Sequence, residues 1–300
     1  MKKLLKVLLL AVMVMMITAC SGGGSASSGG KKKVADDQDV LALHFTTPGT
    51  FESVERYCEV TTEGKLVEKD IVFNFAGGES VGFAVMPGEK LAEMTNVDNL
   101  EQYEINGFKV YRFDSGNDMM AFIQNGEDLY AVDRYLNTVD DGTILKEVLG
   151  GVSFTKNTTT TLDEAGFDEL NYQLDDDHSV YKTATRISED AEGNQTEKMV
   201  FWYYGSDENT DFRFMINAYR NSTFEDILSK EDTYEEKEIN GIAYKVLVNT
   251  NGDPSYEYYT QHGNDVYMIR NSGTSNGWFV DRSEESYTCF EKFLNTVSFK

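Results

Sequence analysis

Few residues of this 300-residue chain have the types and spacing that chemistry requires. The run Gly273–Gly277 satisfies the pattern G-x-S-x-G, in which Ser275 would be the nucleophile of a hydrolase. That role requires a strand before the serine, a helix after it and a histidine later in the chain. A strand-like segment, Trp278-Phe279-Val280, follows instead, and no histidine comes after His262. We therefore expect a glycine-rich loop here, and a hydrolase is only a distant alternative.

The sequence also lacks the usual patterns of metal and cofactor sites. The three histidines, His44, His178 and His262, are isolated, and there is no C-x-x-C motif, H-E-x-x-H motif, EF-hand loop or phosphate loop. Asp175–His178 could hold a divalent cation, but consecutive side chains point in different directions, so a solvated turn is expected. We predict no metal, no cofactor, no catalytic residue and no enzyme activity.

The first twenty residues have the pattern of an export signal. Three lysines fall within the first six residues, and eleven apolar residues follow without interruption from Val7 to Ile17. This apolar run is shorter than the roughly 20 residues that a membrane span needs, which favours a signal peptide over a transmembrane anchor. The segment ends Ile17-Thr18-Ala19-Cys20 and resembles the bacterial lipobox. The resemblance implies that the Cys20 thiol is lipidated and that the chain is cut before it.

The residues after Cys20 suit a tether between a lipid and a folded body. Ser21–Gly30 contains only Ser, Gly and Ala, and Lys31, Lys32 and Lys33 follow. The lysines could contact anionic headgroups or be simply solvated. Removal of residues 1–19 takes away three lysines and no acid, so the net charge changes from −24 to −27. This acidity argues against a nucleic-acid partner, because phosphate binding needs a cationic surface.

Two cysteines, Cys58 and Cys289, remain in the exported part of the chain. In an oxidising compartment they could form one disulfide. Two buried thiols are the alternative that we favour, because cysteine packs as a small hydrophobic residue.

Short identities in the same order predict an internal duplication. Glu104–Gly107 recurs as Glu238–Gly241, 134 residues later, and Val152-Ser153-Phe154 recurs as Val297-Ser298-Phe299. A third match, with Gly126 and Gly263 at corresponding positions, lies between them. We predict a signal peptide (1–19), a lipid-anchored tether (20–40), a first repeat (41–156) and a second repeat (162–300).

Each repeat is expected to be α+β. We predict two tandem antiparallel sheets, each with a short helix and a C-terminal helix packed on it. The short helices are placed at Glu89–Met94 and Phe224–Leu228. Asn-Gly pairs between alternating apolar residues predict type I′ hairpin turns at Asn106-Gly107, Asn125-Gly126 and Asn240-Gly241. The predicted strands are 57–62, 71–75 and 81–86 in the first repeat and 180–187, 199–204 and 212–218 in the second.

This order of elements resembles the PsbP-like family, whose fold is shared with the nuclear transport factor Mog. The matching residues are Ser222–Leu228, Ile239–Gly241 and Phe290–Phe299, with a looser match in the first repeat. The resemblance implies a protein-interaction module without catalytic residues, and often a bacterial lipoprotein.

Two aromatic runs are the remaining candidates for a binding surface. In Phe201-Trp202-Tyr203-Tyr204, alternation places Trp202 and Tyr204 on one face of a strand and the other two residues on the opposite face. Tyr256 and Tyr258 raise the same question in a later strand. Covered core positions are favoured, but Trp202, Tyr204, Tyr256 and Tyr258 could instead form an exposed stacking surface.

The sequence as a whole predicts a membrane lipoprotein on the extracytoplasmic side of the cell envelope. We expect a non-catalytic binding or protein-interaction module. The alternative is a cell-envelope carbohydrate or peptide binder that uses the aromatic strands. The expected partners are the membrane, through the N-terminal lipid, and an envelope protein or glycan.

Overall fold

The computed structural model describes residues 40–46, 50–94, 101–105, 107–114, 118–135, 143–156, 162–174, 179–206, 209–230, 232–249, 255–272 and 284–300. Several predicted features lie outside these residues: the signal segment with Cys20, the tether with its lysines, Asp175–His178 and Gly273–Gly277. A search of the described helices finds none with the length and apolarity of a membrane span.

The chain divides into two compact units, which are described separately. Unit 1 comprises residues up to 58, 66–162 and 188–194, and unit 2 comprises 59–65, 163–187 and 195–300. The first half of the chain has the elements β1 (Leu43–His44), β2 (Ser53–Thr61), β3 (Leu66–Phe75), β4 (Glu79–Met86), α2 (Leu91–Met94), β5 (Glu101–Ile105), β6 (Phe108–Asp114), β7 (Asp118–Asn125), β8 (Asp128–Tyr135), α3 (Thr143–Gly150) and β9 (Ser153–Phe154).

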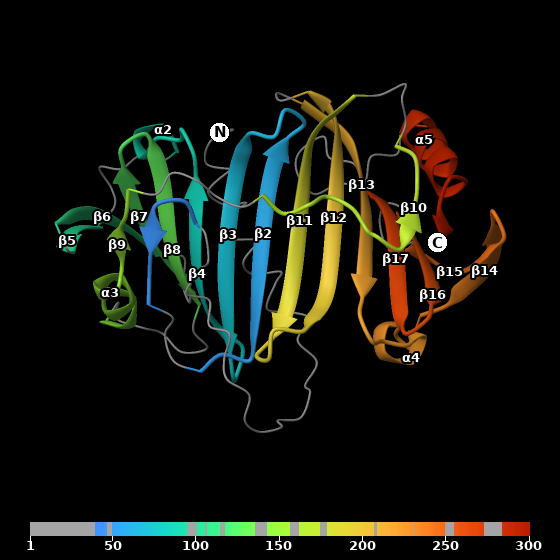
Figure 1. Cartoon of the computed structure of the whole chain (residues 1–300), viewed down its shortest axis with the longest axis horizontal. Helices are drawn as coiled ribbons and strands as arrows, with labels where there is room; N and C mark the ends of the chain where they lie inside the picture. Colours follow the sequence, from blue (N-terminus) through green and yellow to red (C-terminus); the bar gives the residue numbers. More distant parts are fainter. Residues whose placement is uncertain are drawn as a thin grey trace. The chain divides into compact units, whose positions relative to one another are not determined.

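The second half has the same succession of elements (Figure 1). They are β10 (Leu170–Asn171), β11 (Val180–Asp190), β12 (Gln195–Ser206), β13 (Asn209–Tyr219), α4 (Phe224–Ile227), β14 (Tyr234–Ile239), β15 (Ile242–Asn249), β16 (Ser255–His262), β17 (Asp265–Ser272), α5 (Glu284–Leu294) and β18 (Ser298–Phe299). In both halves the first short strand pairs with the last one, β1 with β9 and β10 with β18. Ancestry by duplication and the repeat boundaries at 41–156 and 162–300 remain predictions.

The predicted fold class, α+β with two tandem sheets, is wrong. Fourteen strands among the described residues belong to one antiparallel sheet, in the order β14-β15-β16-β17-β13-β12-β11-β2-β3-β4-β8-β7-β6-β5. Helix is scarce, because α2 and α4 are only four residues long. Alternating apolar residues specify which face of a strand is buried, but they do not specify the strand that pairs with each edge.

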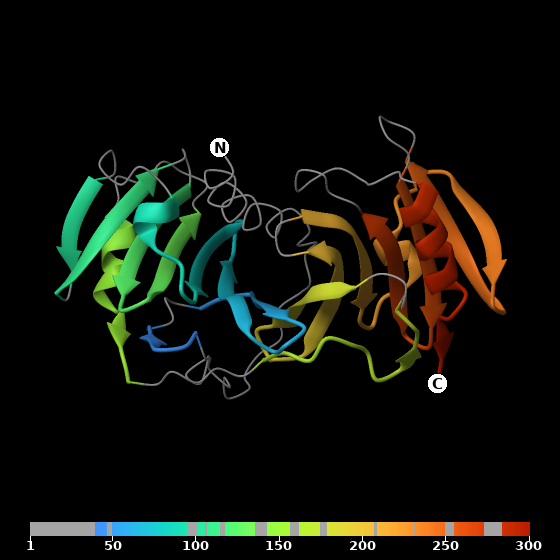
Figure 2. The same ribbon diagram turned by 90° about the horizontal axis from the view of Figure 1, so that it is seen from above.

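The main core of unit 2 lies between one face of its strands and α5. Even-numbered residues of β12 and β13, including Trp202, Tyr204 and Phe214, pack with Phe290 and Phe293 of α5. Figure 2 shows α5, in red, lying along the strands of this unit. The core of unit 1 is built in the same way, with Phe73 and Phe83 from the strands and Leu145 and Leu149 from α3.

Within the part of the chain that the structure describes, the opposite sheet face is covered only in part. In unit 2, α4 packs Phe224 and Ile227 against a small cluster that includes Met215 and Met268. In unit 1, Leu91 of α2 packs against a corresponding cluster. One-turn helices cannot cover a whole sheet face, so part of the second face consists of half-buried polar and aromatic residues.

The Asn-Gly turns differ in detail. Asn240 and Gly241 form the two-residue turn between β14 and β15, and both have positive φ, 51° and 75°. Asn125 instead belongs to β7 and pairs with Asp128, so the turn residues are Gly126 and Glu127.

Candidate functional site

The aromatic residues singled out in the sequence lie mostly in the core. Trp202, Tyr204 and Tyr258 are at most 2% exposed. The Trp202 ring contacts Tyr172 and lies 6.2 Å from the Phe293 ring. Tyr256 is half-buried and packs against the same core. These side chains therefore do not provide the exposed surface that glycan stacking requires.

The other pair of the same aromatic run lies on the opposite face, beside two cations. We call Tyr181, Lys182, Phe201, Tyr203 and Arg213 the cation–aromatic cluster; all belong to unit 2. Lys182 Nζ lies 4.4 Å from the Tyr203 ring centroid, and Arg213 Cζ lies 5.4 Å from that of Phe201. Tyr203 and Arg213 are direct cross-strand partners on β12 and β13. All members except Tyr203 are half-buried, so the cluster is accessible at its rim.

An ion pair holds one of the cations in place. Lys182 Nζ lies 2.8 Å from Glu59 Oε1, and Glu59, also in unit 2, is buried. Burial disfavours the charged ammonium, but the Glu59 carboxylate outweighs this effect and raises the pKa of Lys182. Lys182 is therefore a fixed positive charge at neutral pH.

Two further ion pairs lie on the strands beside the cluster. Arg270 of β17 contacts Glu257 of β16 at 3.0 Å, and Arg186 of β11 contacts Glu197 of β12 at 3.4 Å. Tyr259 donates a hydrogen bond to the second oxygen of Glu257. The acidic chain thus has a strip of paired cations and anions on this side of unit 2.

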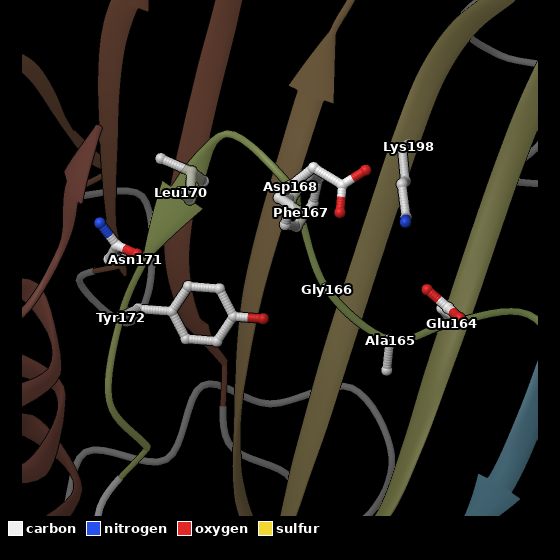
Figure 3. Close-up of a pocket in the computed structure, with 9 residues that line it drawn as sticks. All are labelled: Glu164, Ala165, Gly166, Phe167, Asp168, Leu170, Asn171, Tyr172 and Lys198. Atoms are coloured by element: carbon white, nitrogen blue, oxygen red, sulfur yellow. The ribbon is translucent and has the colours of Figure 1, made fainter. Parts of the chain in front are cut away.

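A separate pocket of about 450 Å³ lies in unit 2, where the segment 164–172 crosses β12 (Figure 3). Lys198 of β12 forms one wall, and its Nζ lies 5.5 Å from the Phe167 ring centroid. Glu164 and Asp168 are exposed carboxylates, and the Tyr172 ring forms another wall. Burial raises the pKa of Tyr172, so its hydroxyl is a protonated donor at neutral pH.

A largely half-buried polar network fixes the middle of the pocket segment. Arg220 binds Glu169 and also Asp265, the latter at 2.7 Å, and Tyr267 Oη donates to Glu169 at 3.0 Å. Burial opposes ionisation of Glu169, but the hydrogen bonds from Arg220 and Tyr267 lower its pKa below the usual value. The carboxylate is therefore ionised at neutral pH and ties the segment to Tyr267 of β17 and to Arg220, which directly follows β13.

The remaining sequence candidates are not brought into a common site. Cys58 on β2 and Cys289 on α5 are both buried thiols, and a disulfide between them stays a prediction. His44 is exposed, and His262 stacks on Phe299 at 4.1 Å. The described residues contain no group of three or more His, Cys, Asp or Glu side chains that could hold a metal ion.

Sequence reasoning missed the cluster although a signal was present. Residues 212, 214, 216 and 218 of β13 are all apolar, whereas 213, 215, 217 and 219 are Arg, Met, Asn and Tyr. The mixed face is the partly covered one, because Arg213 and Tyr219 are half-buried whereas Met215 and Asn217 are buried. The cross-strand register places Phe201 beside Met215 and Tyr203 beside Arg213 on this face. For the Glu169–Arg220 network, among 51 acidic residues, no comparable sequence signal exists.

Comparisons with known proteins give only distant structural similarity. No family model and no curated protein matches the chain. Immunity protein TplEi of T6SS from Pseudomonas aeruginosa is 9% identical, with a TM-score of 0.24, and the match covers 87% of this chain and 95% of that one. The Tle4-Tli4 complex matches with 8% identity and a TM-score of 0.23, and the match covers 86% of this chain and 95% of that one. MucB in complex with MucA(peri) matches with 5% identity and a TM-score of 0.20, and the match covers 83% of this chain and 94% of that one. The last two structures are complexes between proteins, but the likeness is too distant to support an inference about this chain.

Proposed function

We propose that the chain is a lipid-anchored extracytoplasmic protein that binds a protein partner and catalyses no reaction. The observation that carries the binding role is the cation–aromatic cluster on the partly covered sheet face of unit 2. Protein interfaces are enriched in Tyr, Phe and Arg, and these residues often contribute most of the binding energy.

The geometry of the cluster favours a protein over a glycan. Lys182 and Arg213 lie over the rings of Tyr203 and Phe201, so cations already occupy part of the ring faces that a sugar would stack on. Both cations also give this face of an acidic chain a local positive charge, which attracts an acidic group of a protein partner. Little side-chain freedom remains to be lost on binding, because the cluster is already packed.

The N-terminal sequence supports the anchoring part of the proposal. The lipobox resemblance at Cys20 would supply the lipid, and the flexible residues 21–30 of the tether have a root-mean-square reach of about 17 Å, which would keep the body near the membrane. A body with a net charge of −27 would be held at an anionic membrane by its lipid and not by its surface charge.

Site-specific photo-crosslinking in living cells tests the binding face. A photoreactive phenylalanine analogue replaces Phe201 in the full-length chain, and in a matched control it replaces Tyr111. Tyr111 is also a half-buried aromatic residue on a strand, with Lys109 Nζ 5.1 Å from its ring, but it lies in unit 1. We expect a discrete adduct with a second protein from position 201 and none from position 111. No adduct at 201, or the same adduct at both positions, would overturn the proposal.

A further inference from the structure

We propose that the pocket formed by residues 164–172 and Lys198 is a binding site for a free basic amino acid such as arginine. This site is separate from the cation–aromatic cluster, and the inference goes beyond the proposed protein-binding role. It depends on the size, the charges and the fixed walls of the pocket.

The pocket has the size of a small-molecule site. Its volume of about 450 Å³ falls in the range of roughly 300–1,000 Å³ that is typical of ligand pockets. The Phe167 and Tyr172 rings supply apolar walls, and Asn171 adds a polar group at the rim. An amino acid with a long side chain fits such a space and leaves room for water.

The charges of the pocket are complementary to those of a basic amino acid. Lys198 and the Tyr172 hydroxyl are donors for a carboxylate, whereas Glu164 and Asp168 are acceptors for cationic groups. In Figure 3 the Lys198 amino group is directed into the pocket, on the side where Asp168 and Glu164 lie. One cation and two anions give the pocket a formal charge of −1. A ligand with one carboxylate and two cations has the opposite charge of +1.

The walls of the pocket are held before any ligand arrives. Glu169 is bound by Arg220 and Tyr267, and Leu170 and Asn171 pair with the C-terminal strand β18. A fixed site loses little conformational entropy on binding, which favours affinity for a small ligand.

Gly166 provides room for the Tyr172 hydroxyl at the pocket wall. Its φ is 156°, and a Cβ at this position would lie 3.2 Å from Tyr172 Oη. Gly166→Ala would therefore both strain the backbone and displace the hydroxyl that faces the proposed ligand.

Isothermal titration of the full-length chain in a mild detergent with L-arginine tests the proposal. L-citrulline is the matched ligand, since it has nearly the same shape and a neutral side chain. We expect saturable arginine binding and at least about tenfold weaker citrulline binding, as expected for loss of a charge-assisted hydrogen bond. Absence of saturable arginine binding, or equal affinity for both ligands, overturns the proposal.

Matched variants locate the binding. Lys198→Ala should weaken arginine binding by about tenfold or more. Lys245→Ala should not change it, because Lys245 also lies over a ring, that of Phe224 at 4.8 Å, but outside the pocket. Asp168→Asn should lower the arginine affinity more than the citrulline affinity. Equal arginine affinities for Lys198→Ala and Lys245→Ala would also contradict the site. None of these measurements uses the cation–aromatic cluster, so they are independent of the crosslinking result.

Discussion

Ion pairs and charged hydrogen bonds hold individual residues of unit 2 in place, in addition to apolar packing. Glu169 is the clearest case, because Arg220 and Tyr267 both donate to one carboxylate in a half-buried position. Burial alone would raise the pKa of Glu169, yet these donors lower it below 4.5. A group with a lowered pKa in the folded state stabilises the fold fully above its unfolded pKa, and this contribution is lost as the pH falls through the folded pKa.

We therefore expect Glu169→Gln to lower the free energy of unfolding at pH 7 by about 1–2 kcal/mol, because the half-buried Arg220 loses one of its two carboxylate partners and keeps Asp265. The difference from wild type should shrink as the pH falls below about 4.5. Urea unfolding at a series of pH values between 7 and 3 measures the loss of stability at pH 7 and its decrease at lower pH. Glu192→Gln, at an exposed position, is the control and should have little effect at any pH. A difference that stays constant down to pH 3 would contradict this role of Glu169.

Trp202 should behave as a core residue. It is 2% exposed and contacts Tyr172 and Phe293, so Trp202→Ala should cost about 3–5 kcal/mol of unfolding free energy. Phe201→Ala, at the adjacent half-buried position, should cost less. Chemical denaturation of both variants and of the wild type measures these differences in the free energy of unfolding. A wild-type stability for Trp202→Ala would show that its side chain is not packed as described.

The sequence could predict that the two aromatic pairs of β12 lie on opposite faces, because alternation is a property of every strand. It could not predict from β12 alone which face is covered, since both pairs are aromatic. The composition of β13, with Arg213 opposite Tyr203, contains that information. The pocket residues come from a segment with no regular pattern, and their proximity to Lys198 depends on long-range contacts.

At the level of elements, the apolar middles of the strands predict their positions, and each strand extends beyond its predicted range at one end or at both. β12 was predicted at 199–204 and runs over Gln195–Ser206, because polar residues continue the backbone ladder beyond the buried part. The short helix after β13 was predicted at Phe224–Leu228 and is found at Phe224–Ile227. Its Thr223 N–H donates to Asp226 at 2.7 Å, a local cap that can be inferred from sequence.

The β14–β15 turn requires a positive φ at Gly241, and this requirement can be tested by substitution. Gly241 has a φ of 75°, and a Cβ there would meet no atom within 4 Å, so Gly241→Ala tests backbone strain alone. We expect a loss of about 1–2 kcal/mol in unfolding free energy. Gly150→Ala, at the end of α3, also has free space but no positive φ, and should be neutral or stabilising by up to about 1 kcal/mol. Equal effects of the two substitutions would argue against the strained turn.

For the whole molecule, the sequence predicts antiparallel strands and closing helices. It does not predict that fourteen strands belong to one sheet. The alternation of apolar residues indicates which face of a strand is buried. The strand that pairs with it at an edge depends on segments far away in the chain. The short helices predicted at Glu89–Met94 and Phe224–Leu228 are single turns in the structure, so they cover less of the sheet than the predicted helix layer would.

Lipid anchoring through Cys20 would determine where the whole chain is located. Cys20→Ala should abolish incorporation of labelled palmitate, because the thiol that would accept the lipid is absent. The variant should then leave the membrane fraction, since a body with a net charge of −27 has little attraction to anionic lipid. Cell fractionation with palmitate labelling measures both effects. Continued labelling and membrane retention of Cys20→Ala would reject lipid anchoring at this residue.

We propose that unit 2 binds a protein partner through the cation–aromatic cluster, and this interaction can be tested in living cells. Its most direct test is photo-crosslinking from position 201 in the full-length chain, compared with the same chain carrying Arg213→Glu. We expect a discrete protein adduct that is lost or strongly reduced with Arg213→Glu at equal protein level, because the substitution reverses the charge beside Phe201. An adduct of undiminished yield with Arg213→Glu, or no adduct in either chain, would contradict it.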